Sequence, residues 1–350
     1  MLPRIISIGY AVPEHAYSQR LIFNELAYPQ RLWRLFAGSK IDKRHFWVPL
    51  DRLRKLSWQE QQEEFLKGAI SLSKQAIINC LDKRDVGDIG CVVFSSCTGF
   101  VPGPTIPHYL GKEFGFAPDT YYTNIGSMGC ESGFPGLKRA TDFTVVTGKP
   151  SLVIACELSS CSYFPEPDGK PDQENHFELA RSNAIFADAA IAALVSYDDD
   201  TRHPMIIDMK TYTNTDYLDD LGFVWRDGRL RVKLSRRVPE LAASVVRPSI
   251  MAVLKRNELK VRDINWWVIH AAGNSVLDNI RDALGVNEGK MSLSRETLRL
   301  FGNTSSTSVG ITGKRLMSED IKPGDFVIML SVGPGLTGGA TLLQFQREAV

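Results

Sequence analysis

The sequence predicts an α/β protein whose sheets are covered by helices. Short apolar runs rich in β-branched residues alternate along the chain with longer amphipathic stretches, and this alternation is typical of sheets with helices packed against them. The chain has 350 residues, which is enough for a large core and two subdomains. The predicted strands span residues 4–12, 91–96, 151–158, 189–197, 264–271 and 325–332, and the clearest helical patterns span 63–81 and 246–257.

Two parts of the chain can be aligned by their spacing. Cys130 lies 33 residues after Cys97, which ends one predicted strand, and Asn303 lies 33 residues after His270, which ends another. Both Cys130 and Asn303 are followed by a glycine-bearing turn, a basic helix and an apolar strand at the same offset of 24 residues. These matching offsets predict a duplicated αβ unit, although coincidence among regular α/β spacings is the alternative.

The predicted halves are residues 1–170 and 171–350, with the boundary in the polar stretch 166–176. If the halves are pseudo-symmetric, loops at corresponding strand ends converge on one place, where pockets of such sheets form. The alignment therefore predicts that Cys130, His270 and Asn303 share one site. Taken alone, a buried histidine or an asparagine in a turn would carry little weight.

Charge and cysteine content exclude several classes of protein. Lys and Arg total 41 and Asp and Glu total 40, so the net charge of +1 gives no support for a nucleic-acid partner. No apolar run approaches the ~20 residues that cross a bilayer, so we expect no membrane association. The six cysteines show no pairing framework and lie mostly in strand-like runs, which favours a reducing, cytoplasmic location.

Cys130 lies among small residues just before a predicted helix. Pro135 is tolerated only in the first turn of a helix, so the helix should begin between Glu131 and Phe134. Free N–H groups and the helix dipole at that position favour a thiolate, and we expect the pKa of this thiol to lie below its free value. The alternative is a small buried hydrophobe, which is the more common role of cysteine.

A thiol, an imidazole and a carboxamide together suit acyl-thioester chemistry. The thiolate of Cys130 can accept an acyl group. His270 and Asn303 can donate hydrogen bonds to the carbonyl oxygen of a second thioester, where enolate charge develops. This arrangement favours carbon–carbon bond formation over hydrolysis, but a hydrolase that activates water with the histidine stays open.

Seven motifs, in this order and spacing, resemble the type III polyketide synthases (chalcone-synthase-like) of the thiolase superfamily, and the resemblance runs nearly end to end. They span residues 38–46, 95–104, 129–136, 155–160, 183–190, 289–306 and 333–337. The resemblance implies a thiolase fold, which is a five-layered αβαβα arrangement of two pseudo-symmetric halves. It also implies a cytoplasmic homodimer that needs no metal or organic cofactor.

The resemblance further implies a reaction and a set of roles. Cys130 would accept an acyl group from an acyl-CoA, and His270 and Asn303 would promote decarboxylation of malonyl-CoA, so that a Claisen condensation builds a polyketide such as a pyrone or resorcinol. Phe186 would lie between the catalytic cavity and the CoA tunnel, and Ser162 and Ser305 would line the pocket. The basic residues that could contact CoA phosphates are Arg31, Arg34, Lys40, Lys43 and Arg44.

The sequence departs from the family pattern around the proposed site. Residues 270–273 read His-Ala-Ala-Gly in place of His-Pro-Gly-Gly, and residues 331–333 read Ser-Val-Gly in place of Gly-Phe-Gly. Glu131 follows the cysteine where the family has an apolar residue, and Pro135 replaces a residue that continues the helix. These changes leave the starter, the number of extensions and the cyclisation mode undetermined.

Other readings therefore stay open. A β-ketoacyl-carrier-protein synthase III-like ketosynthase would use the same three residues to join acyl chains once, and would call for an acyl carrier protein as a partner. A catalytically silent thiolase-fold subunit that binds a partner is a second alternative. A comparison of acyl-CoA with acyl-carrier-protein donors, and mass analysis of the Cys130 peptide, separate these readings.

Overall fold

The computed structural model describes residues 2–82, 84–162, 173–226 and 229–346. In these ranges the main sheet has nine strands, in the order β11-β12-β13-β8-β1-β7-β6-β4-β5. Its strands are β1 (Arg4–Ala11), β4 (Cys91–Ser96), β5 (Tyr121–Gly126), β6 (Ser151–Leu158), β7 (Asp188–Ser196), β8 (Met205–Thr213), β11 (Trp266–Ile269), β12 (Phe326–Gly333) and β13 (Thr337–Gln344). The six predicted strands are confirmed; β5, β8 and β13 were missed.

Two short antiparallel strand pairs lie outside the main sheet, and both border the region of the site. The first joins β2 (Ala16–Ser18) to β3 (Lys43–His45), and the second joins β9 (Leu221–Arg226) to β10 (Arg229–Leu234). The helices are α1 (Gln19–Glu25), α2 (Trp33–Gly38), α3 (Trp58–Leu81), α4 (Ile106–Phe114), α5 (Gly133–Thr147), α6 (Gln173–Asn183), α7 (Val238–Arg256), α8 (Asn274–Leu284), α9 (Ser292–Phe301) and α10 (Thr307–Leu316).

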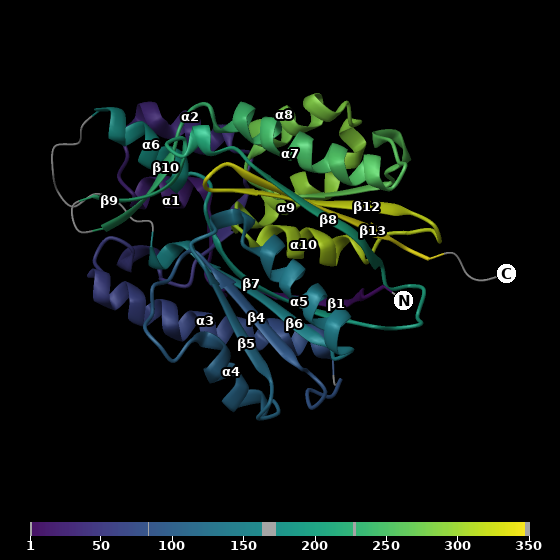
Figure 1. Cartoon of the computed structure of the whole chain (residues 1–350). Helices are drawn as coiled ribbons and strands as arrows, with labels where there is room; N and C mark the ends of the chain where they lie inside the picture. Colours follow the sequence, from purple (N-terminus) through teal and green to yellow (C-terminus); the bar gives the residue numbers. More distant parts are fainter. Residues whose placement is uncertain (1, 83, 163–172, 227–228, 347–350) are drawn as a thin grey trace.

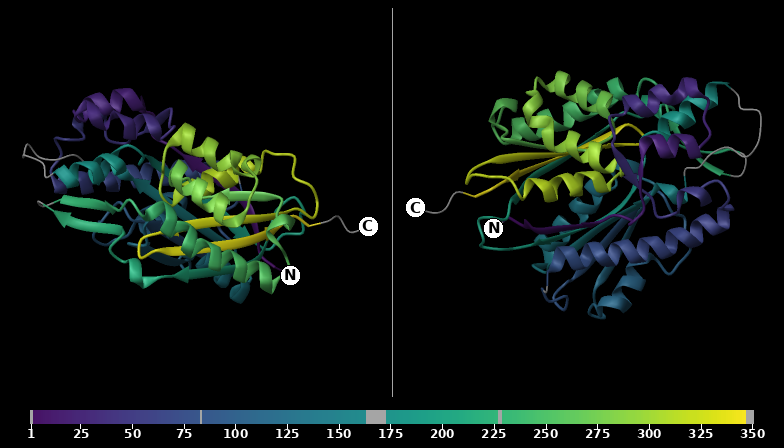
Figure 2. Two further views of the ribbon diagram at one scale, coloured as in Figure 1. Left: turned by 90° about the horizontal axis from the view of Figure 1, so that it is seen from above. Right: turned by 180° about the vertical axis from the view of Figure 1, so that it is seen from behind.

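The helices and the two groups of strands form five layers (Figure 1). Helices α3 and α4 cover one outer face, and α7 and α8 cover the opposite outer face. Between the two strand groups lie α5 and α10, each of which contacts strands of both groups. The view from behind in Figure 2 shows α3 along the full width of its sheet. The implied five-layered αβαβα arrangement is confirmed.

The two strand groups follow the same plan. In the first group β4 is parallel to β6, which is antiparallel to β7, and β7 is antiparallel to β1. In the second, β11 is parallel to β12, which is antiparallel to β13, and β13 is antiparallel to β8. Helix α5 precedes β6 as α10 precedes β12. The predicted duplication of an αβ unit is therefore confirmed by the strand pairing.

The predicted boundary between residues 1–170 and 171–350 falls outside the described residues and stays a prediction. In the sheet, β7 follows that boundary in sequence but still pairs with β6 and β1 of the first group. The groups touch through one register pair, Arg4 with Met205. Along the chain, the last strand of the first group therefore ends at Ser196 and the first strand of the second group begins at Met205.

Small residues let the central helices lie close to the sheets. A Cβ atom on Gly310 would lie 3.0 Å from the Ile191 side chain, and one on Gly313 would lie 3.1 Å from that of Ile8. Such close packing holds α10 against β7 and β1. Asn303 lies four residues before the start of α10, so this packing helps to position the loop that carries it.

All six cysteines are free, and Cys130 differs from the other five because it is partly exposed, whereas the others are buried. This agrees with the expectation that the cysteines have no pairing framework. No helix of the described ranges combines the length and the apolar character needed to cross a lipid bilayer.

Candidate active site

The turn between β5 and α5 carries Cys130. Gly129 opens a single 3₁₀ turn, Gly129–Glu131, with a left-handed φ of 59°, and a Cβ atom there would lie 2.1 Å from Cδ of Pro334. Only glycine fits this position. Helix α5 begins at Gly133 with Pro135 in its first turn, so the predicted helix start is confirmed.

Cys130, His270 and Asn303 line one cavity of about 440 Å³. They come from three separate places in the chain, namely the β5–α5 turn, the end of β11 and the loop between α9 and α10. Phe186 lines the same cavity and is 7 % exposed. The structure thus brings together the three residues that the 33-residue offsets had aligned, with the aromatic residue that the resemblance placed beside them.

The His270 ring is fixed by Ser308. His270 Nδ1 lies 2.6 Å from Ser308 Oγ, and the backbone N–H of Ala271 donates to the same oxygen at 3.2 Å. Ser308 Oγ can donate its own hydrogen to Nδ1 while it accepts from Ala271, and in that arrangement the ring proton is on Nε2. Burial also lowers the pKa of His270 to about 3. A neutral imidazole can then offer its Nε2–H to an oxygen in the cavity.

The Asn303 amide is held at both ends. Its Nδ2 donates to the carbonyl of Ala272 at 3.1 Å, and its Oδ1 accepts the N–H of Ser305 at 2.8 Å. An amide nitrogen carries two hydrogens, so one remains for a ligand. Asn303 and His270 line the same cavity, so both can offer a hydrogen to an oxygen bound there, and donors of this kind stabilise an enolate.

The expectation of a lowered thiol pKa is wrong. Burial raises the pKa of Cys130 to about 12, and the negative charge of the buried Glu157 acts in the same direction. Ser305 opposes this shift by donating its hydroxyl to Sγ at 3.3 Å. The sequence argument considered the helix dipole but not the loss of water around the sulfur, and desolvation is the larger effect here.

A buried polar network lies behind the nucleophile, and sequence reasoning missed it. Glu157 is fully buried on β6 and accepts from the backbone N–H of Cys97 at 3.0 Å and from Ser306 Oγ at 2.6 Å. Cys97 Sγ lies 3.7 Å from Ser305 Oγ, which continues to Cys130. Only the motif 155–160 contained a hint, because a glutamate in an otherwise apolar strand requires buried partners.

The remaining predicted pocket residues have different positions. Ser305 contacts the sulfur of Cys130, as described above, but it is not part of the cavity wall. Ser162 is buried and donates its hydroxyl to the carbonyl of Thr98, also away from the cavity wall. Neither position tests the role that the resemblance implies for these serines, and both roles stay predictions.

Three arginines line the cavity: Arg34 on α2, Arg181 on α6 and Arg236 before α7. Arg34 and Arg236 both lie over the ring of Phe177, at 5.7 and 6.0 Å, and neither they nor Arg181 forms an ion pair among the described residues. Of the predicted CoA contacts, Arg34 is at this site. Arg44 is not available, because its side chain is buried; Arg31, Lys40 and Lys43 do not line the cavity.

Some of the residues that depart from the family pattern line the cavity, and one lies behind the cavity wall. Val332 and Ala272 line the cavity, where Val332 stands in place of the family's phenylalanine and Ala272 in place of its first glycine after the proline. Glu131 points away from the cavity: its Oε1 would lie 3.0 Å from a Cβ atom on Gly339, which pairs with Ser331 across β12 and β13. Burial raises the pKa of Glu131 to about 8.

Comparison with known proteins agrees with this geometry. Residues 254–345 match the family described as 3-oxoacyl-[acyl-carrier-protein] synthase III, C terminal. The chain is 27 % identical to a 3,5-dihydroxyphenylacetyl-CoA synthase of Amycolatopsis orientalis, over 98 % of this chain and 94 % of that one. It is 26 % identical to a 1,3,6,8-tetrahydroxynaphthalene synthase of Streptomyces coelicolor, over 91 % of this chain and 83 % of that one.

Solved structures show the same fold. The type III polyketide synthase domain of Steely1 from Dictyostelium superposes with a TM-score of 0.89 at 20 % identity and covers 99 % of both chains. The tetrahydroxynaphthalene synthase of Streptomyces coelicolor superposes with a TM-score of 0.88 at 23 % identity, over 98 % of this chain and 99 % of that one. Fold and site thus define a thiolase-fold acyltransferase. The chain is similar to these synthases over nearly its whole length, and it has the fold of type III polyketide synthases of known structure.

Proposed function

We propose that this protein loads an acyl group from a CoA thioester onto Cys130 and extends it with malonyl-CoA to make a polyketide. The observation that carries the proposal is the cavity shared by Cys130, His270 and Asn303. The named relatives are synthases of aromatic polyketides, which supports the same class of product, such as a resorcinol or a pyrone.

Loading begins with a neutral thiol, because the Cys130 thiol and the His270 imidazole are both uncharged in the cavity. The thiol proton is released as the sulfur reaches the acyl carbonyl, and the departing CoA sulfur takes it up. The sulfur attacks the acyl carbonyl, the carbon–sulfur bond to CoA breaks, and the CoA thiol leaves with the proton.

Extension uses the two hydrogen-bond donors. Malonyl-CoA releases CO₂, and the electron pair of the broken bond forms an enolate whose oxygen accepts from His270 Nε2 and Asn303 Nδ2. The enolate carbon attacks the acyl group on Cys130, a carbon–carbon bond forms, and the bond to the sulfur breaks. The product is a β-ketoacyl thioester of CoA, and the thiolate is free for another cycle.

The three arginines of the cavity support CoA as the donor. Guanidinium groups bind phosphates through paired hydrogen bonds, and three of them line this cavity. A nucleotide carrier with several phosphates meets this requirement better than the single phosphate of a carrier-protein arm. The alternative, a synthase III-like enzyme with an acyl-carrier-protein partner, predicts the opposite preference.

The test follows acyl mass on the Cys130 peptide and malonyl decarboxylation separately. We expect Cys130→Ala to abolish loading and chain extension. His270→Ala and Asn303→Ala should slow decarboxylation by about 10²–10³-fold, the usual cost of one oxyanion donor, and loading by less. Cys91→Ala, which removes a cysteine buried in β4, is the matched control and should keep both activities.

Each result bears on one alternative. Polyketide formation by Cys130→Ala would remove this residue from the mechanism, and equal losses of loading and decarboxylation would contradict the roles of His270 and Asn303. Free acid without malonyl consumption would indicate a hydrolase. No acyl mass on the wild-type peptide would favour the silent subunit, and a preference for acyl-carrier-protein donors would favour the synthase III-like reading.

We further propose that the protein is a cytoplasmic homodimer. The six unpaired cysteines suit a reducing compartment. The end strand β5 and the C-terminal turn of α5 carry exposed apolar side chains, including Tyr121, Val145 and Val146, and a second copy would cover them.

A further inference from the structure

The core next to the candidate site contains an arginine without an ion pair. Arg44 on β3 is 1 % exposed, and its guanidinium lies between the rings of Phe36 and Phe46, at 6.0 and 5.3 Å. It donates from Nε to Gln19 Oε1 at 2.9 Å, whereas Nη2 has no hydrogen-bond partner in the part of the chain that the structure describes. No carboxylate pairs with it among the described residues.

A buried charge of this kind is costly. Burial lowers the pKa of Arg44 to about 9, since the neighbouring Asp188 compensates only in part. An unpaired buried cation destabilises a fold unless its hydrogen bonds offset the loss of water. Arg44 also donates from Nη1 to the backbone carbonyl of Phe186 at 2.8 Å, and this bond indicates why a buried arginine is useful here.

Successive carbonyls around Phe186 are held by different partners. Gln19 Nε2 donates to the carbonyl of Ala184 at 2.7 Å, and Arg44 holds that of Phe186. Between them, the carbonyl of Ile185 accepts the backbone N–H of Asn303 at 2.8 Å. The carbonyl of Asn303 in turn accepts the N–H of Ala187, the residue after Phe186, at 3.0 Å. The strand-like bridge of Phe186 with Asn303 therefore lies inside a frame made by Gln19 and Arg44.

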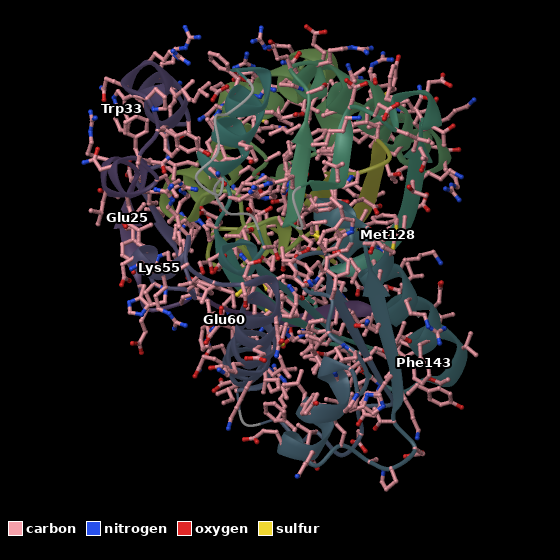
Figure 3. The ribbon with its side chains drawn as sticks, turned by 90° about the vertical axis from the view of Figure 1, so that its left-hand side faces the viewer. Glu25, Trp33, Lys55, Glu60, Met128 and Phe143 are labelled. Atoms are coloured by element: carbon pink, nitrogen blue, oxygen red, sulfur yellow. The ribbon has the colours of Figure 1, made fainter. Side chains whose placement is uncertain are left out.

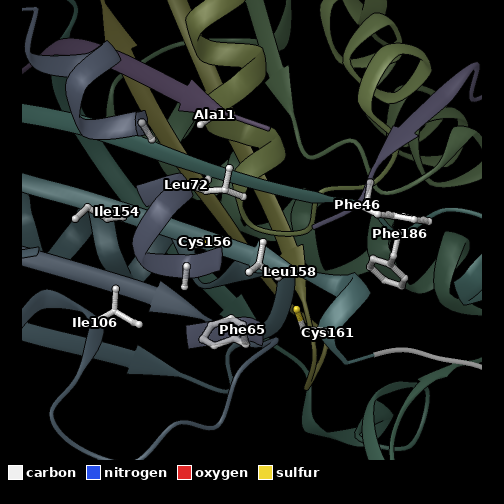
Figure 4. Close-up of a cluster of buried hydrophobic side chains, with 14 of the residues drawn as sticks. Ala11, Phe46, Phe65, Leu72, Ile106, Ile154, Cys156, Leu158, Cys161 and Phe186 are labelled. Carbon is white, nitrogen blue, oxygen red and sulfur yellow. The ribbon is translucent and has the colours of Figure 1, made fainter. Parts of the chain in front are cut away.

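The aliphatic part of Arg44 contacts the other side of the same bridge. A Cβ atom on Gly302 would lie 2.8 Å from Cγ of Arg44 and 2.9 Å from the carbonyl of Ile185, and Gly302 has a left-handed φ of 75°. Gly302 immediately precedes Asn303 in sequence. Figure 4 shows Phe46 beside Phe186, and Phe186 also lines the cavity.

We propose that Arg44, together with Gln19, is a positioning residue that clamps the Phe186 segment against the Asn303 loop. The clamp fixes the backbone from which the Asn303 amide reaches the thioester oxygen. It acts on the decarboxylation step of the proposed function, on which this inference rests, and it has no part in transfer of the acyl group to Cys130.

The test compares Arg44→Lys with Arg4→Lys. Arg4 is also buried, at 2 % exposure, and donates to backbone carbonyls of Asp198 and His203 at 2.8 and 2.6 Å, but it lies outside the cavity wall. A lysine has no planar fork and cannot serve both Gln19 and Phe186. We expect Arg44→Lys to slow malonyl decarboxylation at least about tenfold and acyl loading less than about threefold, because misplaced donors act mainly on the enolate.

Amide hydrogen exchange provides a readout that does not depend on activity. The peptides that contain residues 184–187 and 302–305 should exchange faster in Arg44→Lys than in the wild type, and at the wild-type rate in Arg4→Lys. If Arg44→Lys does not fold, Gln19→Glu replaces it: this variant keeps an acceptor for Arg44 but loses the donor to Ala184, and the same changes are expected.

The clamp would be overturned if Arg44→Lys had the wild-type ratio of decarboxylation rate to loading rate and the wild-type rates of amide hydrogen exchange in both peptides. If Arg44→Lys and Arg4→Lys each lost decarboxylation and loading activity in equal proportion, Arg44 would only stabilise the fold. This result would also overturn the clamp. A wild-type protein that never acylates Cys130 would instead reject the proposed function, while the exchange data would still decide whether the clamp exists.

Discussion

At the scale of single residues, His270 depends on a serine that the sequence motifs did not mark. Ser308 Oγ lies 2.6 Å from Nδ1 and also accepts from the N–H of Ala271, and when it donates its hydrogen to Nδ1 the ring proton is on Nε2. The Nε2–H form is the one that can donate to a thioester oxygen. Ser308 touches no substrate in this scheme, so it is a positioning residue for His270.

We predict that Ser308→Ala slows malonyl decarboxylation about tenfold, because the ring loses the partner that holds its tautomer and orientation. Acyl loading, followed by mass on Cys130, should change little. Ser308→Thr keeps a hydroxyl at the same position and serves as the control, with most of the activity restored. Equal activity in the alanine and threonine variants would show that the hydroxyl has no role in catalysis.

How far the sequence predicted the site depends on the range of each interaction. Cys130, His270 and Asn303 were aligned because a duplicated unit repeats its spacing, which is visible in one dimension. Ser308 lies 38 residues from His270, and Ser306 lies 149 residues from Glu157, and neither pair shares a repeat. The predicted thiol pKa was wrong for a related reason: desolvation depends on everything packed around the sulfur, which no local motif contains.

At the scale of elements, β5 has the most consequential position. It ends the main sheet among the described strands, pairs only with β4, and leads directly into the turn that carries Cys130. Val146 at the end of α5 is 82 % exposed and Tyr121 at the start of β5 is 62 % exposed. Figure 3 shows Met128 and Phe143 on the same side of the molecule, so this face reaches from α5 to the nucleophile turn.

We predict that Val146→Glu shifts the protein from dimer to monomer, because a carboxylate would be buried without a partner in the proposed interface. Analytical ultracentrifugation across a range of protein concentrations measures the shift. Met251→Glu, which alters an exposed apolar side chain on α7, is the matched control and should leave the mass unchanged. A wild type that is monomeric at all concentrations would contradict the assignment of this face.

The elements missed by sequence analysis share a cause. Strand β13 contains two glycines and β5 has alternating exposed positions, so neither gives a continuous apolar run. Both become strands because neighbours supply their hydrogen bonds: β13 lies between β12 and β8, and β5 lies against β4. Tertiary pairing overrides a weak local pattern in each case.

At the scale of the whole molecule, Glu131 couples stability to pH. Its carboxyl is buried over Gly339, and Oε2 has no hydrogen-bond partner. The raised pKa of about 8 means that the folded protein keeps this proton where the unfolded chain has lost it. The unfolded state then binds fewer protons, so the contribution of Glu131 to the free energy of unfolding falls as pH rises from about 4.5 to 8.

We therefore predict that Glu131→Gln, which cannot ionise, becomes more stable than the wild type as pH rises, by at least about 1 kcal/mol at pH 8.5. Urea unfolding at pH 5.5, 7 and 8.5 measures the difference. Buried Glu157 and Asp188 also titrate with raised pKa values but are common to both proteins, so the comparison isolates Glu131. Parallel stability curves for the two proteins would rule out this coupling.

The sequence by itself determined the α/β class, the duplicated unit and the three residues that meet in the cavity. Periodicity and spacing are properties of the chain in order, and a repeat carries them over long distances without any knowledge of packing. Only the tertiary structure showed the desolvation of the thiol, the contact of His270 with Ser308, the arginines around the cavity and the buried contacts of Arg44. Desolvation and hydrogen bonds between distant residues arise when elements pack, and these interactions have no signature in local sequence.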